Sequence, residues 1–211
     1  MNIFAVDNNP FKAATMLCDE HVIKMPMEAV RILCSVLKSS FNIDDVPYST
    51  NLDGTHGCVV WASESPDNFE WLLNYGFALC EEYKRRYHKL PKARRLLVSV
   101  RSIYKNQLWG RLLEFKCLTQ TKFYLCMPDN FRKFDAIESY RYYYANTFAR
   151  ILKYTNRMPP IWMLTKSTPF CEDYFESTHT TVWRHPECNT AALEALLCRN
   201  EVSVEAQADL N

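Results

Sequence analysis

Glycine is scarce in this sequence, with four residues in 211. Loops that cradle phosphates and turn-rich β-sandwiches both depend on glycine, so a glycine-rich nucleotide site and an all-β fold are disfavoured. Long hydrophobic runs are missing too, because no apolar stretch approaches the roughly 20 residues that a bilayer span requires. The first residues also lack the basic segment that begins a secretory signal. We therefore expect a cytoplasmic protein that makes no membrane contact.

The nine cysteines form no C-x-x-C pair and are odd in number, and most lie within apolar stretches such as the one around Cys34. Without a secretory signal, this usage is typical of reduced thiols in a protein core. One arrangement has ligand types that suit tetrahedral zinc, C-x7-H-x5-H-x2-C, formed by Cys171, His179, His185 and Cys188. Its spacing fits no common zinc finger. Loop histidines beside buried thiols remain the favoured interpretation, and we expect no cofactor.

Apolar residues recur at helical spacing along most of the chain, which predicts a mainly α fold. One amphipathic segment runs from about residue 18 to 39 and contains Pro26, which is expected to kink or split it. A second helix should begin at Ser65-Pro66-Asp67, where a capping hydroxyl precedes a first-turn proline, and run to about residue 87. Further helices are expected near Pro10, from Pro91 and over 135–154. Residues 42–57 are expected to form a polar loop.

The near-zero net charge of +1 conceals three unlike segments. Residues 1–83 hold 4 Lys/Arg and 12 Asp/Glu, residues 84–157 hold 18 and 4, and residues 158–211 hold 3 and 8. Aromatic residues are interleaved with the basic side chains of segment 84–157. Cations can contact phosphates while flat rings stack on unpaired bases, so this segment is a candidate nucleic-acid surface. A solvated helix face above core aromatics would give the same pattern.

Four ionisable residues follow one another at spacings of three, four and three: His21, Lys24, Glu28 and Arg31. On a helix these spacings place all four on one face, while apolar residues fill much of the remainder. Such a face is costly unless it meets water or lines a site. A carboxylate held beside Lys and Arg would keep its charge and could stabilise a cationic intermediate. A solvated stripe of weak ion pairs is the alternative interpretation.

The order of several short motifs resembles the phage pyrimidine-dimer DNA glycosylases of the endonuclease V type, and more closely a group of phage proteins of similar layout. The family's D-x-H helix start is similar to Asp19-Glu20-His21, and its R-E-x-P-R segment is similar to Met27–Arg31. Its G-H stretch resembles Thr55–Trp61, and its C-terminal R-P-x-W-Y resembles Arg157–Trp162. Met27 stands where the family has arginine. The resemblance covers about residues 1–163.

This resemblance implies a compact, single-domain helical fold over residues 1–163, with residues 164–211 as a C-terminal extension of unknown role. It also implies a DNA base-excision glycosylase with AP-lyase activity, which uses the N-terminal amine as nucleophile and forms a Schiff base. Asn2 usually leaves the initiator methionine in place, so Met1 would supply the amine. Glu28 would stabilise the cationic sugar, and Arg31 and His21 would hold the phosphates and sugar. The target nucleotide would be flipped from the duplex.

The expected partner is double-stranded DNA with an altered base, bound by a monomer in the host-cell cytoplasm if the protein is viral. Eleven residues are candidate nucleic-acid contacts: Lys24, His56, Lys84, Arg85, Arg86, Lys92, Arg94, Arg95, Arg101, Lys105 and Arg157. Two alternatives remain open at this point. A non-catalytic nucleic-acid-binding phage protein could retain the same scaffold for genome modification or counter-defence. A protein-interaction module could instead depend on the acidic ends of the chain.

Overall fold

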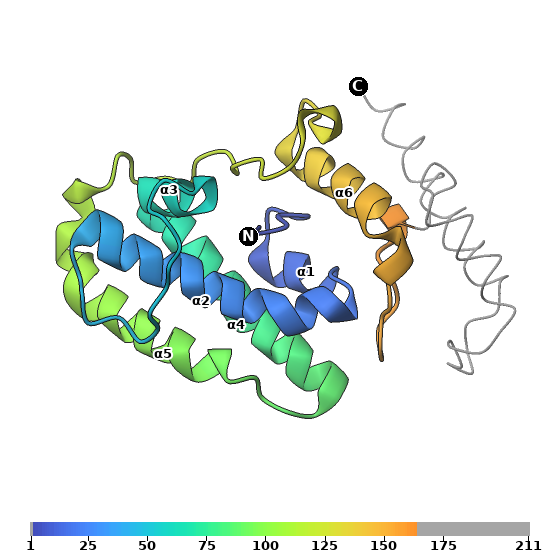
Figure 1. Ribbon diagram of the computed structural model, residues 1–211, viewed down its shortest axis with the longest axis horizontal. Helices are drawn as coiled ribbons and strands as arrows, with labels where there is room; N and C mark the ends of the chain where they lie inside the picture. The colour runs from blue at the N-terminus through green and yellow to red at the C-terminus, as the bar shows by residue number, and fades with distance from the viewer. Residues whose placement is uncertain (1, 164–211) are drawn as a thin grey trace, which may run out of the picture. The chain divides into compact units, whose positions relative to one another are not determined.

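The computed structural model describes residues 2–163, and these residues form a helical structure without strands, which confirms the expected mainly α class (Figure 1). The α-helices are α1 (Pro10–Thr15), α2 (Asp19–Phe41), α3 (Gly57–Glu64), α4 (Pro66–Tyr87), α5 (Ala93–Ile103) and α6 (Ala136–Thr147). A π-helical turn (Tyr104–Leu108) and four 3-10 turns (Trp109–Glu114, Asp129–Phe131, Ala149–Ile151 and Ile161–Met163) complete the regular structure. No helix in this range is long and apolar enough to cross a membrane.

Helices α2 and α4 form the centre of the fold, and α1, α3 and α5 pack around them. Gly76 of α4 permits this close approach, since a Cβ at that position would lie 3.0 Å from Leu97 of α5 and 3.2 Å from Ala29 of α2. Three helices therefore meet at one small residue. In Figure 1, α3 lies on one side of α2 and α5 lies on the other.

Local signals in the sequence account for several helix boundaries. Ser65 caps α4 by accepting a hydrogen bond from Asn68 N at 3.0 Å, and Pro66 occupies the first turn, as the sequence predicts. Asn9 caps α1 by accepting from two backbone N–H groups. Helix α2 continues through Pro26 as one element, so the expected split near Met25 does not occur. Tertiary packing on both sides of the proline outweighs its local cost of about 3 kcal/mol.

One expectation about local structure is wrong, and one helix was not expected. The predicted helix over 135–154 ends at Thr147, because Phe148 leaves helical geometry and packs its ring against His21, with 4.7 Å between ring centroids. The predicted loop is confirmed over residues 42–56, and it is followed directly by α3, a helix that the sequence pattern did not reveal. His56 caps α3 by accepting a hydrogen bond from Cys58 N at 3.2 Å.

A buried ion network connects parts of the chain that are distant in sequence. The Arg86 guanidinium donates to Asp19 Oδ1 at 2.9 Å and to Glu82 Oε1 at 2.8 Å, and it also reaches the carbonyl of Leu17 at 2.9 Å. Arg157 donates to Glu82 as well. Asp19 accepts from the backbone N–H and the hydroxyl of Thr155. The start of α2, the end of α4 and residues 155–157 are thereby held together.

We expect Arg86→Gln to lower the free energy of unfolding by about 3–5 kcal/mol, because it leaves Asp19 and Glu82 buried with less compensating positive charge. Urea denaturation measures this change. The neighbouring Arg85 is exposed, so Arg85→Gln is the matched control and should change stability by less than about 0.5 kcal/mol. Equal losses in the two variants would contradict a structural role specific to Arg86.

Candidate active site

Glu28 lies in the first half of α2 and is nearly enclosed, with 8% of the residue exposed. Lys24, one turn earlier, places its Nζ 3.8 Å from Glu28 Oε1, and the Lys24 side chain is 62% exposed. A carboxylate in this position is shielded by protein on most sides but is reached from solvent along Lys24. Such a carboxylate keeps strong electrostatic interactions with groups that enter beside it.

The N-terminal segment meets Glu28 directly. The backbone N–H of Asn2 donates to Glu28 Oε2 at 3.1 Å. The Asn2 side chain fixes this position, because its Nδ2 donates to the Cys126 carbonyl at 2.7 Å and its Oδ1 accepts from Ile3 N and Phe4 N. The chain therefore delivers its first peptide group to the buried carboxylate in a single, well-anchored orientation.

Phe4 has a backbone φ of 39°, a left-handed conformation that is unfavourable for a bulky side chain. Its carbonyl accepts from Val6 N at 2.8 Å, and its ring packs against His21 at 4.6 Å between centroids. Residues held in such conformations persist only when their surroundings over-determine them. Here the buried side chains of residues 3–6 supply that constraint and hold the N-terminal segment across α2.

The first turn of α3 also borders Glu28 and forms a wall of the site. Burial lowers the pKa of His56 below its ordinary value, and the negative charge of nearby Glu28 opposes this shift. A Cβ at Gly57 would lie 2.1 Å from the ring of Tyr124, so only glycine permits the ring to cover this turn. The Tyr75 hydroxyl is buried and has no hydrogen-bond partner among the described residues. Burial, and then the charge of Glu28, raises its pKa.

Two thiols lie beside this wall. The buried Cys58 thiol makes a hydrogen bond with the Cys126 thiol, which lowers the pKa of Cys126 to about 7. Burial acts in the opposite direction but is the weaker influence. The Cys126 carbonyl also holds Asn2, so both thiols belong to the surroundings of Glu28. We call Glu28 together with Asn2, Lys24, His56 and Cys126 the Glu28 site.

His21 is separated from Glu28 by seven residues of helix, a rise of about 10 Å. The residue is 4% exposed, and its Nδ1 lies 2.6 Å from the Tyr144 hydroxyl. Burial, with a smaller contribution from Lys24, lowers the pKa of His21 to about 4. The imidazole is therefore neutral near pH 7 and belongs to an aromatic cluster with Phe4, Tyr144 and Phe148.

Arg31 is exposed one turn beyond Glu28, and its guanidinium carbon lies 5.8 Å from the ring centroid of Tyr48. The helical stripe predicted from sequence is thus divided by the structure. Lys24 and Glu28 are paired, His21 is internal, and Arg31 faces solvent. Met1 lies outside the described residues, so its position relative to Glu28 remains a prediction.

The candidate nucleic-acid contacts also separate into groups. Arg86 is buried, and Arg157 pairs with Glu82 beside it. Arg94 pairs with Glu81 at the surface. The remaining members of segment 84–157 in the candidate set are exposed: Lys84, Arg85, Lys92, Arg95, Arg101 and Lys105. Most of them lie at the end of α4 or on α5, which is across α2 from α3 and His56 (Figure 1).

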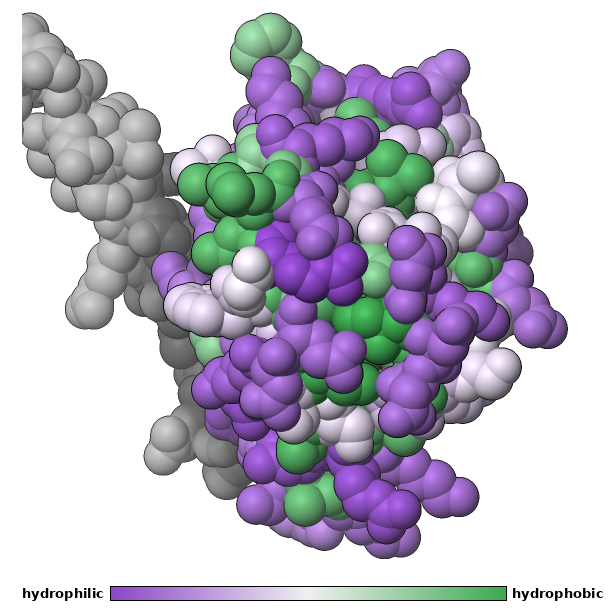
Figure 2. Space-filling model, turned by 90° about the vertical axis from the view of Figure 1, so that its left-hand side faces the viewer, coloured by the Kyte–Doolittle hydropathy of each residue, from purple (hydrophilic) through white to green (hydrophobic). Residues whose placement is uncertain are grey.

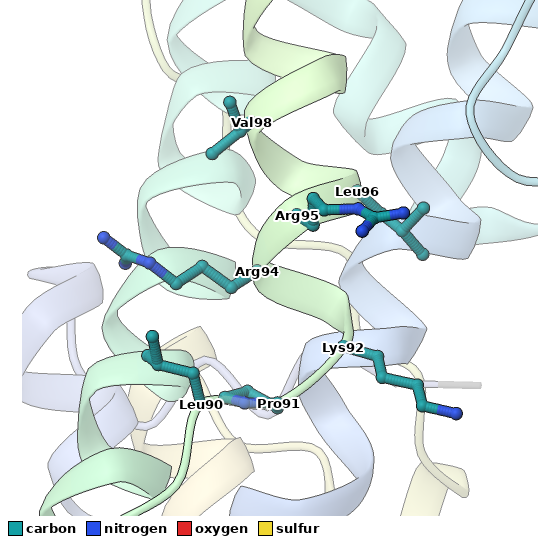
Figure 3. A pocket seen from close by; sticks show the side chains of 7 residues that line it. All are labelled: Leu90, Pro91, Lys92, Arg94, Arg95, Leu96 and Val98. Atoms are coloured by element: carbon teal, nitrogen blue, oxygen red, sulfur yellow. The ribbon is translucent and has the colours of Figure 1, made fainter.

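A groove of about 610 Å³ lies at the start of α5, bounded by Leu90, Pro91, Lys92, Arg94, Arg95, Leu96 and Val98. In Figure 3, Arg94 extends to one side of α5 while Lys92 and Arg95 extend to the other. The cations therefore do not converge on one point, as they would in a built phosphate site. The lining also lacks an acid or a histidine. The groove offers positive charge without the groups that catalyse base excision.

No group of three or more His, Cys, Asp or Glu residues within the described range is arranged to hold a metal ion. The four zinc candidates Cys171, His179, His185 and Cys188 lie outside that range. Sequence reasoning missed Asn2, Tyr75 and Cys126 as neighbours of Glu28, and Tyr124 as a neighbour of Gly57. The approach of Cys126 to Glu28 is purely tertiary, since about 100 residues separate the two in sequence. One local feature of the sequence did point to the first turn of α3, namely the resemblance of the Thr55–Trp61 stretch to the family's G-H motif.

The neutral state of buried His21 predicts a specific pH dependence of stability. Its folded pKa is lower than its ordinary value of 6.5, so the unfolded chain binds the extra proton first as the pH falls. Stability is retained above pH 6.5 and decreases by roughly 2–3 kcal/mol between pH 6.5 and 4. Because carboxylates contribute as well, the measurement is the difference between wild type and His21→Gln in urea denaturation across this interval. Parallel profiles would contradict the prediction.

The lowered pKa of Cys126 predicts selective alkylation. At pH 7, iodoacetamide should modify Cys126 faster than Cys34 or Cys80, whose pKa values burial raises to about 11 and about 12. Peptide mass mapping assigns each site. Cys58→Ala removes the thiol hydrogen bond and should move the midpoint of the rate profile to higher pH, whereas Cys58→Ser keeps a donor and should move it less. An unchanged midpoint in both variants would refute the assignment.

Comparison with known proteins adds family information to this geometry. Residues 1–94 match the family described as pyrimidine dimer DNA glycosylase. No curated protein and no solved structure matches the chain. The matched range contains Asn2, Lys24, Glu28 and His56 but ends before Cys126, so the resemblance expected for residues 95–163 is not part of the match. Over residues 1–94, the chain is therefore similar to the pyrimidine dimer DNA glycosylases.

Proposed function

We propose that this protein is a DNA base-excision N-glycosylase with AP-lyase activity, which acts on a damaged or modified base in double-stranded DNA. The nucleophile in this proposal is the N-terminal α-amine of Met1, and the reaction passes through a Schiff base with the sugar. Glu28 is the central carboxylate. The family relationship of residues 1–94 favours glycosylase chemistry on DNA, and the geometry around Glu28 favours the amine as its agent.

One observation carries the proposal, the 3.1 Å hydrogen bond from Asn2 N to Glu28 Oε2. The residue before Asn2 is bonded to that nitrogen, and consecutive Cα atoms are about 3.8 Å apart. The α-amine of Met1 therefore belongs to the residue directly before the one whose N–H binds the carboxylate. An N-terminal amine has an ordinary pKa of about 8, so a useful fraction is neutral and nucleophilic near pH 7.

In the first step, the neutral amine attacks C1′ of the target nucleotide, the bond from C1′ to the base breaks, and the base leaves with a proton. Glu28 stabilises the positive charge that develops on the sugar. Ring opening then yields the Schiff base between C1′ and the amine. Removal of a C2′ proton, with Glu28 as base, expels the 3′ phosphate by β-elimination, and water releases the sugar from the amine.

The neighbouring residues have distinct parts in this proposal. Lys24 and exposed Arg31 contact the phosphates next to the target nucleotide, and His56 borders the sugar. The Tyr75 hydroxyl, which has no hydrogen-bond partner among residues 2–163, would be a donor for a group that enters beside Glu28. His21 is a positioning residue, because its buried ring supports Phe4 and through it the N-terminal segment.

A second candidate function is nucleic-acid binding without catalysis. The exposed cations of α4 and α5 favour it, because they lie across α2 from α3 and His56 and do not depend on the carboxylate (Figure 1). Such a protein would bind DNA with a steep salt dependence but would leave the strand intact. It would also tolerate the loss of Glu28.

Borohydride trapping on a duplex with an abasic site tests the mechanism. Wild type should give a covalent adduct, and peptide mapping should place it on Met1. Glu28→Gln should slow the turnover of abasic DNA about 100-fold or more, as loss of a general base typically does, while leaving DNA affinity within about twofold. Glu20→Gln changes an exposed carboxylate in the first turn of the same helix and is the matched control.

Lys24 requires its own control, since its amine lies 3.8 Å from Glu28. Lys24→Arg keeps the charge but removes the amine, so trapping should persist in this variant if Met1 is the nucleophile. Intact mass of the protein establishes whether the α-amine is free. The absence of an adduct under conditions where a known lyase gives one would overturn the Schiff-base mechanism and favour the binding protein.

A further inference from the structure

Phe134 is a fully exposed aromatic residue in the turn before α6, with a relative exposure of 108%. The other rings of this region contact one another: Phe131 packs against Tyr142 and Tyr143, and Tyr144 packs against Phe148. A single exposed apolar side chain is ordinary on a protein surface. What distinguishes Phe134 is the way the backbone on both sides of it is fixed.

Both neighbours of Phe134 are tied to the first turns of α6. Lys133 N donates to the hydroxyl of buried Ser139 at 2.7 Å, and that hydroxyl donates to the Asp135 carbonyl at 2.7 Å. Asp135 caps α6 by accepting from Glu138 N at 3.0 Å. The phenyl ring is thus presented on a rigid base, so little conformational freedom is lost when it enters a partner.

Two cations precede the ring in the chain. Arg132 is half-exposed and pairs with Asp129, and the Lys133 ammonium lies 4.0 Å from the ring centroid of Tyr142. Lys133 directly precedes Phe134 and Arg132 stands one residue earlier, whereas exposed Asp135 directly follows it. The two cations therefore lie on one side of the ring in the chain, where they can contact a phosphate beside an inserted ring. An apolar ring with cations on one side suits DNA, in which base stacks lie between charged strands.

The turn that carries Phe134 is connected to the Glu28 site through α6. The Tyr140 hydroxyl donates to the Tyr124 carbonyl at 2.6 Å and accepts from Cys126 N at 3.4 Å, and the Cys126 carbonyl holds Asn2. The helix that mounts Phe134 is therefore bonded to the wall of the site. In Figure 1 the turn, drawn in yellow, lies at the start of α6, above the N-terminal segment.

We propose that Phe134 is a wedge that enters the base stack of duplex DNA next to the nucleotide taken into the Glu28 site. This inference rests on the proposed action on DNA. Insertion of the ring would unstack one base step and kink the duplex, which lowers the cost of extruding the target nucleotide. Phe134 is then a positioning residue, needed for a paired target and dispensable for one that is already single-stranded.

The experiment compares wild type, Phe134→Ala and Phe134→Trp with a matched control, Leu113→Ala. Leu113 is also an apolar residue of segment 84–157 and is 95% exposed, but it lies in the turn Trp109–Glu114. The face around that end of the molecule shows scattered hydrophobic side chains among hydrophilic ones (Figure 2). The probe is a duplex with a tetrahydrofuran abasic site and an adjacent 2-aminopurine. It reports unstacking by fluorescence and forms no Schiff base.

Wild type, Leu113→Ala and Phe134→Trp should raise the fluorescence of the duplex probe on binding. Phe134→Ala should lose most of this rise and bind the duplex about 10- to 100-fold more weakly, the effect expected for one stacking ring. Its affinity for the single-stranded form of the probe should stay within about twofold of wild type. This contrast between duplex and single strand would not follow from a general loss of charge or folding.

Three outcomes overturn the wedge: an unchanged fluorescence rise in Phe134→Ala, an equal loss of affinity for both forms of the probe, or no binding of either form by wild type. Because the probe is chemically inert, failure of borohydride trapping together with the expected Phe134 result would reject the lyase mechanism and keep the wedge. A trapped adduct together with an unaffected Phe134→Ala would support the lyase mechanism and reject the wedge.

Discussion

The anchoring of the N-terminal segment across α2 is the constraint on which the Glu28 site depends. Buried side chains at residues 3–6 hold this segment, and Asn2 ends it with hydrogen bonds to Glu28 and to the Cys126 carbonyl. The left-handed backbone conformation of Phe4 is the local energetic cost of leading the N-terminal segment across α2. A carboxylate with the same burial but without Asn2 would only be a desolvated charge. With Asn2 in place, it becomes the meeting point of the chain's first peptide group and helix α2.

The Arg86 network supports this arrangement through the first residue of the same helix. Asp19 is the first residue of α2, and its partners fix where the helix begins relative to α4 and to residues 155–157. A buried ion pair is weak evidence for added stability, but the loss of one member is costly, so the network specifies a unique geometry. Any displacement of the start of α2 would move His21 and then Phe4. Asp19 of the network and Glu28, the candidate catalytic carboxylate, thus lie on one helix, with His21 between them.

Much of the helical fold could be predicted from the sequence, because caps and apolar spacing are local: Ser65-Pro66 marks the start of α4 where the structure has it. The end of α6 could not, since it is decided by the packing of Phe148 on His21. For the site, helical spacing placed Lys24 and Glu28 together correctly, but it gave no sign that His21 is internal. Arg86 shows the same limit. Its neighbours in sequence are exposed cations, and only the tertiary approach of Asp19 distinguishes it from them.

The distribution of positive charge explains how one small fold could combine binding with chemistry. The exposed cations of α4 and α5 lie across α2 from His56, so they can attract DNA without competing with substrate for the carboxylate (Figure 1). Near Glu28 the cations are few and individually placed, with Lys24 paired to the carboxylate itself. A dense positive cluster there would stabilise bound phosphates but oppose the cationic sugar of the proposed reaction. Separating the two kinds of charge lets long-range attraction and transition-state stabilisation be optimised independently.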